Sequence, residues 1–464
     1  MEPLTLNEVA QGCAGRLVRG GAETRVCRVT TDSRRTQAGD LFVALRGDRF
    51  DGHAFVGDAA RGGAAGIVAE PERLPAPLPE FPLVAVGDTR RALGELASWY
   101  RRRFALPVVA VAGSNGKTTT KELLAAVLGR RLLTLASEAS FNNDIGVPLT
   151  LLRLERSHAA AVLEAGTNHP GELAPLLAMI RPRYGVLTGL GREHLEHFGD
   201  FAGVVAEEGG LAEALPRDGR LFINGDSPGI ESLVARSRAT VVRVGFGPGN
   251  DWRAADCRLD ETGTTFTVVA ERADFNGEFR LRLLGRHHVI NALLALAVGA
   301  ELGLGPGDIR AGLAGCPPVP LRLELTEIAG LRVLMDCYNA NADSTLAALA
   351  VLRDLPCAGR RLAVLSDMSE LGAHTGAAHA EIGQALVRHG VQGLFAVGAM
   401  AEVLVAAARG TGLGEAGAFP DVPAVAVALR GSARPGDLVL IKASRAARLE
   451  RLLDALRPGG AGTD

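Results

Sequence analysis

Short apolar runs alternate with longer amphipathic stretches along most of this 464-residue chain. The spacing predicts an amphipathic helix over 89–104, followed by apolar runs of four or five residues that recur between helical patterns. Strands that alternate with helices are typical of a parallel sheet covered on both faces. A more β-rich piece, 264–284, then precedes an apolar helix over 291–302. The strands predicted before that piece are 108–112, 160–164, 185–188, 221–224 and 241–244.

Two proline-rich segments divide this pattern. The first, 71–82, suits a loop at a domain edge. The second, 316–320, has three prolines in five residues, which neither a helix nor a central strand tolerates. Helices again separate the strands that follow, as in a doubly wound sheet, and we expect an α/β protein of three domains, 1–86, 87–314 and 315–464. The strands predicted in the last domain are 333–336, 362–366, 394–397 and 438–442.

Composition and charge exclude several classes of protein. Hydrophobic residues make up 47% of the chain and charged residues 22%, which is typical of a folded globular protein. A net charge of -2 and 4% aromatic residues argue against a nucleic-acid partner, which would need basic surface and stacking side chains. No apolar run reaches the roughly 18 residues that a membrane span needs, and the six cysteines are scattered. We therefore expect a cytoplasmic protein with no membrane span. We also expect a monomer, which none of these observations determines.

The firmest motif is a glycine-rich loop after the strand 108–112. It precedes a helix predicted over 121–132, which is the context of a phosphate-binding loop, although Val111 stands where the general pattern has glycine. Backbone N–H groups can surround phosphate oxygens there, while Lys117 adds charge and the Thr118 hydroxyl can bind Mg²⁺. A purely structural turn is disfavoured because Lys117 is one of three lysines in the chain. The expected ATP-binding residues of the loop are Gly113, Ser114, Asn115, Gly116, Lys117, Thr118 and Thr119.

Glu164 and His194 are candidates for a magnesium site. Glu164 ends the strand 160–164, and His194 follows the strand 185–188. Ligands bind at the carboxyl ends of strands in an open parallel sheet, so both side chains should face the phosphate-binding loop. Alone, His194 would more often be a surface or packing histidine, and its assignment depends on Glu164.

Weaker candidates are scattered over the rest of the chain. Clusters of Asn and Gly most often form turns, a single Asn can cap a helix, and a single Arg can be a surface charge. Each of these residues is a weak candidate alone and becomes a stronger one only together with the others. They are Asn142, Asn143, Asn224, Asp226, Asn291, Arg322, Asp336, Lys442, Ser444 and Arg445.

Taken together, these stretches resemble the Mur ligases over essentially the whole chain. The N-terminal stretches are similar to that family's uridine-nucleotide-binding domain, and the middle stretches are similar to its ATP and Mg²⁺ site. Those of the last domain resemble the branch that adds D-alanyl-D-alanine. The stretches are 31–34, 39–45 and 51–53, then 113–122, 141–149, 164–173 and 194–196, and finally 338–344, 367–368 and 370–372.

The resemblance implies a uridine-binding α/β domain, a central P-loop ATPase domain and a Rossmann-like C-terminal domain. It also implies an ATP-dependent ligase of peptidoglycan synthesis that joins D-alanyl-D-alanine to UDP-N-acetylmuramoyl-tripeptide. In the family's chemistry, the peptide carboxylate takes the γ-phosphoryl group of ATP, and the amine of D-alanyl-D-alanine then displaces phosphate from the acyl phosphate.

Residue roles follow from the same resemblance. Lys117, Glu164, His194 and Arg322 would act in catalysis, with two Mg²⁺ ions among Thr118, Glu164 and His194. Contacts to ATP beyond the loop would come from Asn291, Arg322 and Asp336. Those to the other substrates would come from Ser33, Arg34, Asn142, Asn143, Lys442, Ser444 and Arg445.

The chain departs from the family at the second Mg²⁺ ion. Where the family carries a carbamylated lysine, this chain has Glu208, and no lysine lies between 121 and 442. A carbamylated lysine is electrostatically a carboxylate on a long arm. We predict that Glu208 supplies the same charge to the metal, with a water bridging its shorter arm. In the alternative, Glu207 and Glu208 form a solvated helical face. Smaller departures are His288, where the family usually has Asn, and Ala443, where it has Gly.

Two other functions stay open at this point. Another amide ligase of the same fold fits the central motifs, but the stretch 338–341 argues against the diaminopimelate-adding Mur enzyme and the stretch 31–34 argues against folylpolyglutamate synthase. A nucleotide-binding protein without catalysis fits the missing lysine, but it has no need of two metal sites.

Overall fold

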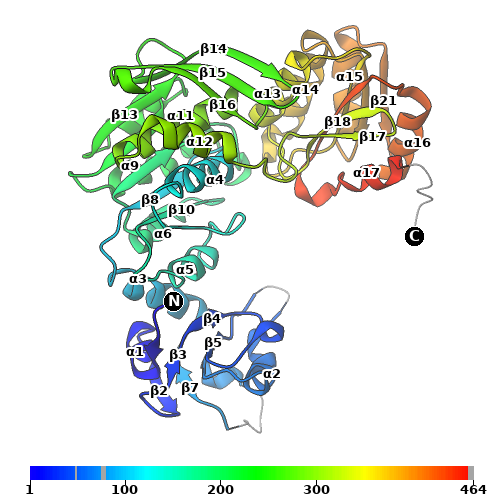
Figure 1. Ribbon diagram of the computed structural model, residues 1–464. Coiled ribbons are helices and arrows are strands. Elements are labelled where there is room, and N and C mark those ends of the chain that lie inside the picture. Colours follow the sequence, from blue (N-terminus) through cyan, green and yellow to red (C-terminus); the bar gives the residue numbers. More distant parts are fainter. Residues whose placement is uncertain (48–49, 75–79, 458–464) are drawn as a thin grey trace.

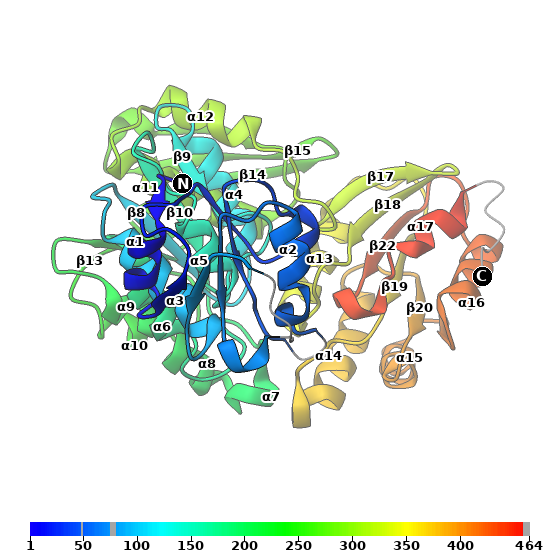
Figure 2. The same cartoon turned by 90° about the horizontal axis from the view of Figure 1, so that it is seen from below.

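The computed structural model describes residues 1–47, 50–74 and 80–457, which form three large sheets, a two-stranded sheet and the helices around them (Figure 1). The large sheets lie within 16–85, 108–281 and 324–442. Figures 1 and 2 show the N-terminal part (blue) and the C-terminal part (yellow to red) against different sides of the central part. Because each sheet is complete before the next begins, we propose domain boundaries after residues 86 and 314. Residues 75–79 of the proline-rich segment and 458–464 of the last domain lie outside the described residues.

The N-terminal sheet has the strand order β2-β7-β6-β5-β4 and is parallel except for the β2–β7 pair. Helix α1 begins with a capping box, in which the Thr5 side chain accepts from the Glu8 N–H and the Glu8 carboxylate accepts from the Thr5 N–H. Strands β1 and β3 pair separately. The elements are β1 (Leu4–Thr5), α1 (Leu6–Gly12), β2 (Arg16–Arg19), β3 (Arg25–Val26), β4 (Arg28–Thr30), β5 (Asp40–Val43), α2 (Val56–Arg61), β6 (Gly66–Ala69) and β7 (Leu83–Ala85).

The central sheet has nine strands in the order β16-β15-β14-β13-β12-β11-β8-β10-β9. It is parallel from β9 to β14, and β14, β15 and β16 then continue it as antiparallel neighbours. The β-rich piece predicted over 264–284 is therefore the edge of the central sheet. The strands are β8 (Val108–Ala112), β9 (Thr134–Ala136), β10 (Ala160–Glu164), β11 (Tyr184–Leu187), β12 (Arg220–Asn224), β13 (Thr240–Gly245), β14 (Trp252–Asp260), β15 (Gly263–Ala270) and β16 (Gly277–Leu281).

Helices cover both faces of this sheet, as the alternating pattern predicted. Along β8, Val108, Ala110 and Ala112 belong to one apolar core, while Val109 and Val111 belong to the other. Successive side chains of a strand point to opposite faces, so one apolar strand serves both cores. The helices are α3 (Thr89–Arg101), α4 (Lys117–Leu128), α5 (Gly146–Leu151), α6 (Leu173–Ile180), α7 (Leu195–Phe198), α8 (Phe201–Glu208), α9 (Gly210–Ala214), α10 (Ile230–Val234), α11 (Arg286–Glu301) and α12 (Pro306–Gly315).

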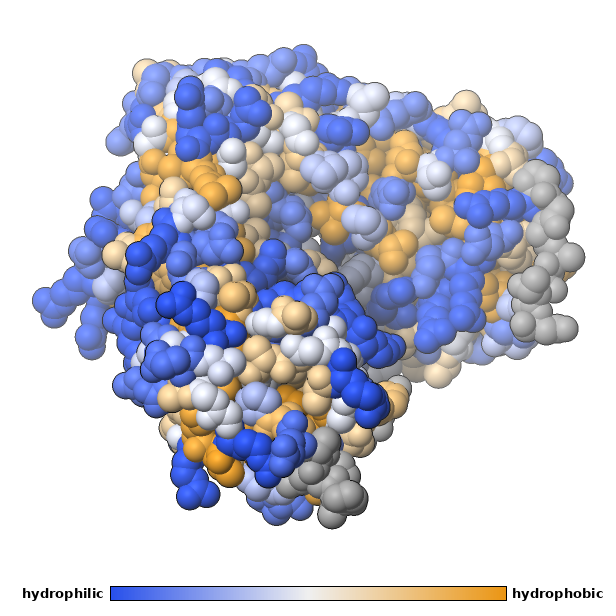
Figure 3. Space-filling model, turned by 60° about the horizontal axis from the view of Figure 1, so that its bottom comes forward, coloured by the Kyte–Doolittle hydropathy of each residue, from blue (hydrophilic) through white to orange (hydrophobic). Residues whose placement is uncertain are grey.

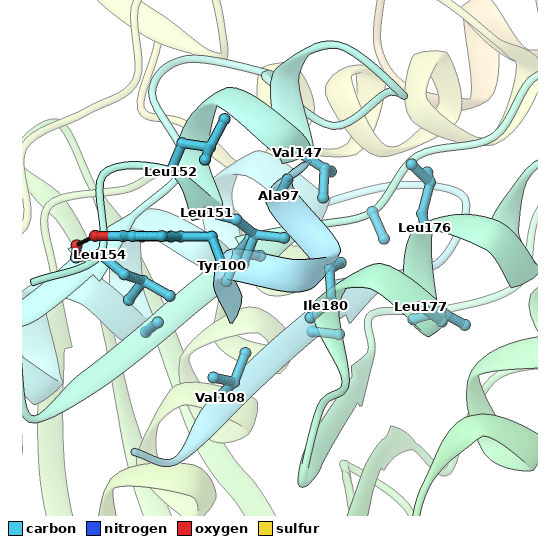
Figure 4. Packing of buried hydrophobic residues seen from close by; sticks show 14 of the residues in the cluster. Ala97, Tyr100, Val108, Val147, Leu151, Leu152, Leu154, Leu176, Leu177 and Ile180 are labelled. Atoms are coloured by element: carbon cyan, nitrogen blue, oxygen red, sulfur yellow. Dashed lines mark hydrogen bonds between the residues drawn. The ribbon is translucent and has the colours of Figure 1, made fainter. Parts of the chain in front are cut away.

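Helix α3 packs against α5 and α6 in the core that contains Val108, Ala110 and Ala112 (Figure 4). Its Tyr100 is fully buried, donates a hydrogen bond to the Leu154 carbonyl at 2.6 Å and accepts one from the Glu2 N–H at 2.7 Å. One phenol thus ties the N-terminal segment to the central domain. The helix ends at Arg101, three residues before the predicted end at 104.

Replacing Tyr100 by Phe is expected to lower the free energy of unfolding by about 1–3 kcal/mol, because one buried and one partly buried backbone group lose their partner. Urea unfolding followed by circular dichroism measures the change. The exposed neighbour Arg102 provides the control, since Arg102→Ala should leave the midpoint in place. Equal midpoints for Tyr100→Phe and the wild type would contradict the expected role of the phenol.

The C-terminal sheet has the order β17-β18-β22-β19-β20-β21 and is parallel except for the β17–β18 hairpin. Four of its strands lie within a few residues of the predicted positions, and β17 and β21 were not predicted. Within the described part of the chain, no helix is long and apolar enough to cross a membrane. The elements are β17 (Glu324–Ile328), β18 (Leu331–Asp336), α13 (Ala342–Asp354), β19 (Arg361–Leu365), α14 (Thr375–Arg388), β20 (Gly393–Val397), α15 (Ala401–Gly410), β21 (Glu415–Phe419), α16 (Val422–Ser432), β22 (Leu438–Lys442) and α17 (Arg451–Leu456).

Candidate active site

A cavity of about 1280 Å³ lies between the central and C-terminal parts, and its lining extends from Arg90 to Lys442. Figure 3 shows a recess where the parts of the molecule meet. Residues from distant parts of the sequence converge here because the carboxyl ends of the central parallel strands face the C-terminal sheet. The predicted site residues on the lining are Ser114, Asn115, Gly116, Lys117, Thr118, Thr119, Asn142, Asn143, Glu164, His194, Asn224, Asp226, Asn291, Arg322, Asp336 and Lys442.

The glycine-rich loop joins β8 to α4, and its backbone requires glycine at two positions. Gly113 and Gly116 have φ angles of +114° and +87°. A Cβ atom on Gly113 would lie 2.6 Å from the Thr188 hydroxyl oxygen, and one on Gly116 would lie 2.8 Å from Asn291 Oδ1. Positive φ and close approach both exclude larger residues. Helix α4 begins at Lys117 rather than at residue 121 as predicted, so the end of the loop already forms the helix N-terminus.

Lys117 lies at the centre of a group of carboxylates. Its Nζ donates to the Gly113 carbonyl at 2.6 Å and lies 3.5 Å from Glu193 Oε1. Burial opposes the charged form of Lys117, but Glu193, Glu208 and Glu164 together hold its pKa above the ordinary value. The ammonium group therefore stays charged in the cavity wall. Sequence reasoning missed Glu193, although it directly precedes His194.

Glu164 and Glu208 each bury a carboxylate oxygen for which the described residues offer no hydrogen-bond partner. The other oxygen of Glu164 accepts from Asn142 Nδ2 at 2.9 Å. Glu208 is 2% exposed, and burial raises its pKa to about 8 although the Lys117 charge lowers it. Unpartnered buried oxygens are costly unless a cation or a proton satisfies them. Both residues thus fit a hard cation such as Mg²⁺.

His194 faces the C-terminal part. Its Nδ1 pairs with the Glu370 carboxylate, while its Nε2 lies 3.8 Å from Glu193 Oε2. The hydrogen bond from His194 lowers the pKa of Glu370. Among the residues that the structure describes, no group of three His, Cys, Asp or Glu side chains is arranged to hold a metal ion. Thr118, Glu164 and His194 therefore line the cavity without forming an assembled metal site, and Glu208 lies outside the lining.

The alternative of a solvated helical face at the end of α8 is wrong. Glu207 accepts the N–H groups of Gly171 and Leu173, both at 2.8 Å. Arg236 closes the helix end by donating to the Ala206 carbonyl at 2.7 Å. These contacts fix the helix end, and with it Glu208, against the phosphate-binding loop.

Arg322 and Asn291 lie beside the phosphate-binding loop. The Arg322 guanidinium donates to the Thr118 hydroxyl at 3.2 Å and lies over the Tyr338 ring, 4.3 Å from its centroid. Asn291 Nδ2 lies 3.3 Å from Nδ1 of His288, whose pKa burial lowers well below the ordinary value. His288 is therefore a neutral neighbour of Asn291.

Lys442 and Ser444 hold the C-terminal part together in this structure. Lys442 Nζ, which is almost fully buried, donates to Asp336 at 2.8 Å and to the Asn339 carbonyl at 2.9 Å. The Ser444 hydroxyl donates to the Asp367 carbonyl at 3.1 Å. Both polar groups thus position the β18 end and the loop that carries Glu370.

Four predicted substrate contacts, Ser444 among them, lie away from the cavity lining. Arg445 is exposed and paired with Glu450. In the N-terminal part, Ser33 begins a short 3-10 helix and Arg34 is paired with Asp32 at 2.9 Å, with its side chain 86% exposed. The structure does not bring these residues to the cavity, and their predicted roles stay predictions.

Comparison with known proteins agrees with this architecture part by part. Three family models match the chain. The model described as "Mur ligase family, catalytic domain" matches residues 25–101, "Mur ligase middle domain" matches 111–299, and "Mur ligase, glutamate ligase domain" matches 321–445. The UDP-N-acetylmuramoyl-tripeptide--D-alanyl-D-alanine ligase of Escherichia coli is 37% identical over 99% of this chain and 100% of its own length.

Solved structures resemble the chain over nearly its full length. MurF from Acinetobacter baumannii superposes with a TM-score of 0.89 at 29% identity, covering 98% of this chain and 99% of the other. MurF ligase from Thermotoga maritima in complex with ADP gives a TM-score of 0.80 at 28% identity, with 92% and 96% covered. With this fold, this phosphate-binding loop and these matches, the chain belongs to the Mur ligase family.

Proposed function

We propose that the chain joins D-alanyl-D-alanine to UDP-N-acetylmuramoyl-tripeptide at the expense of ATP, releasing ADP and phosphate. The observation that carries the proposal is the cavity in which the phosphate-binding loop faces the segment Tyr338 to Asn341 of the C-terminal part. The names of the similar proteins, one of them with ADP bound, support the same reaction. The product would be the pentapeptide precursor of peptidoglycan.

The reaction would proceed in two displacements. The terminal carboxylate of the tripeptide attacks the γ-phosphorus, so that the bond to the β-phosphate oxygen breaks and ADP leaves. The amine of D-alanyl-D-alanine then attacks the acyl carbon, and phosphate leaves as the amine loses a proton. Both steps depend on positioning and charge neutralisation more than on a protein nucleophile.

The residues of the cavity wall suit these demands. Lys117 and the N–H groups at the start of α4 would bind the β- and γ-phosphates, and Arg322, 3.2 Å from the Thr118 hydroxyl, would add charge on the same side. Asn291 and Asp336 line the same cavity where the rest of ATP would lie. Ser33 and Arg34 would contact the uridine-linked substrate once the N-terminal part is brought to it.

Magnesium fits here because Glu164 on the cavity lining and the buried Glu208 each have a carboxylate oxygen without a partner among the described residues. Thr118, Glu164, Glu208 and His194 would hold the ions, with water completing the coordination. The ions would neutralise phosphate charge as it develops. His194 would have to exchange its contact with Glu370 or offer its other ring nitrogen.

Phosphate release from ATP tests the proposal. We expect steady turnover only when both UDP-N-acetylmuramoyl-tripeptide and D-alanyl-D-alanine are present. The tripeptide alone should support at most a small burst. Phosphate release at the same rate with and without the two substrates would indicate a nucleotide-binding protein of another kind. Turnover with diaminopimelate and the shorter UDP-linked dipeptide, in place of this pair, would indicate the diaminopimelate-adding reaction.

A further inference from the structure

The segment 191–194 lies between the phosphate-binding loop and the C-terminal part. On the loop side, the Gly191 N–H donates to the Ser114 hydroxyl oxygen at 2.9 Å, and the Ser114 hydroxyl donates to the Gly191 carbonyl at 3.2 Å. Glu193 approaches Lys117 to 3.5 Å. Alternate residues of the segment therefore touch the site where the phosphates would bind.

Arg192 faces the other way and joins two helices of the C-terminal part. Its backbone N–H donates to Asp343 Oδ2 at 2.7 Å, and its Nε and Nη2 donate to Asp343 Oδ1 at 3.1 and 2.7 Å. Its Nη1 donates to Glu381 Oε2 at 2.7 Å. Asp343 lies in the first turn of α13 and Glu381 lies in α14. All three guanidinium nitrogens are thus engaged by carboxylates of the C-terminal part.

The contact continues at the N-terminus of α13. Asn341 caps this helix by accepting the Ser344 N–H at 2.8 Å, and its Nδ2 donates to Asn115 Oδ1 of the phosphate-binding loop at 3.0 Å. A Cβ atom on Gly191 would lie 2.9 Å from Asp343 Oδ2 and 3.2 Å from Asn115 Nδ2. The loop, the segment and α13 therefore meet without space for a side chain at residue 191.

We propose that Arg192 is a positioning residue that holds the C-terminal part against the phosphate-binding loop. Through Asp343 and Glu381 it fixes the α13 N-terminus, and with it the segment 338–341, beside Asn115 of the phosphate-binding loop. The catalytic consequence rests on the proposed ligase function, whereas the structural consequence does not. These ion pairs are about one third exposed and are therefore screened by salt. The contact between the C-terminal part and the phosphate-binding loop should weaken as ionic strength rises.

A charge exchange tests this role, with Arg192→Glu and Glu381→Arg made singly and together. Each single variant places like charges at the contact and is expected to increase the radius of gyration in small-angle scattering of the ligand-free protein. Each should also lower kcat/KM for D-alanyl-D-alanine by about tenfold or more. The double variant keeps one cation and two carboxylates at the contact, as in the wild type, and should regain the compact profile and most of the activity. The matched control is Arg388→Glu, which reverses an exposed charge in α14, the helix that carries Glu381.

A neutral variant gives a second test that does not depend on the exchange. The wild-type scattering profile should expand as NaCl is raised, while Arg192→Gln should be expanded from the start and respond little to salt. Single variants with wild-type scattering, or a double variant no better than Arg192→Glu in scattering and in kcat/KM, would overturn the proposal. If scattering behaves as expected but the wild type has no ligase activity, the proposed function fails and the positioning role of Arg192 stands.

Discussion

Replacing Lys117 by Met is expected to lower ATP-dependent ligation by about 10³-fold. Lys117 is the cation of the phosphate-binding loop; its side chain is 13% exposed, and the charges of Glu164, Glu193 and Glu208 act on its Nζ. Its removal would take one positive charge from the phosphates and leave the carboxylates facing them. Both changes oppose binding of the γ-phosphoryl group.

The measurement is product formation at saturating substrates together with ATP affinity by calorimetry. Arg130→Met is the matched control, because it removes an exposed cation just beyond the other end of α4. Arg130→Met should retain wild-type rates. A Lys117→Met variant that is folded by circular dichroism and retains more than about a tenth of the wild-type rate would contradict the role of this lysine in charge neutralisation.

The sequence predicted the phosphate-binding loop well because every signal for it is local. An apolar strand, two glycines with forced positive φ and a lysine at a helix start lie within about ten consecutive residues. Strands β8 and β10 also have the predicted limits, since each is a short apolar run with polar residues after it. The start of α4 was misplaced by four residues because glycine and threonine have weak helix propensity, while the phosphate-loop geometry overrides it.

Contacts between segments that are distant in the sequence could be predicted less well. Glu208 and Glu207 read as two charges on a helix, and nothing local shows that one is buried beneath Gly113 while the other binds the start of α6. Arg192 and Glu193 belong to a short polar stretch, and their partners lie in two different parts of the fold. Such pairings are set by how the sheets face each other, which a single sequence does not encode in any nearby pattern.

The family resemblance supplied what local reasoning lacked, although it did not determine geometry. It indicated His194 as a metal ligand, but in the structure Nδ1 of His194 pairs with Glu370 of the C-terminal part. It indicated Lys442 as a substrate contact, but the ammonium group is buried against Asp336. In both cases the side chain has a carboxylate of its own chain as its partner.

Glu208→Gln is expected to lower activity by about 100-fold and to raise the Mg²⁺ concentration needed for half-maximal rate. The amide has the size of the carboxylate but lacks its charge, so the buried oxygen that now has no partner among the described residues could no longer attract a cation. Glu402→Gln in α15 neutralises an exposed carboxylate and is the matched control. Mg²⁺ titrations of all three proteins, read by activity and by calorimetry with ADP, give the comparison.

Carbon dioxide provides the sharper test of the same residue. If Glu208 itself supplies the negative charge, wild-type activity should be the same in bicarbonate-depleted and bicarbonate-restored buffer. In Glu208→Lys, the amine can add to carbon dioxide with loss of a proton, giving a carbamate with a carboxylate-like end. That variant should be inactive without bicarbonate and regain activity when it is added. Strong stimulation of the wild type by bicarbonate would show that its site needs a carbamate elsewhere, and Glu208 would then have no part in binding the metal.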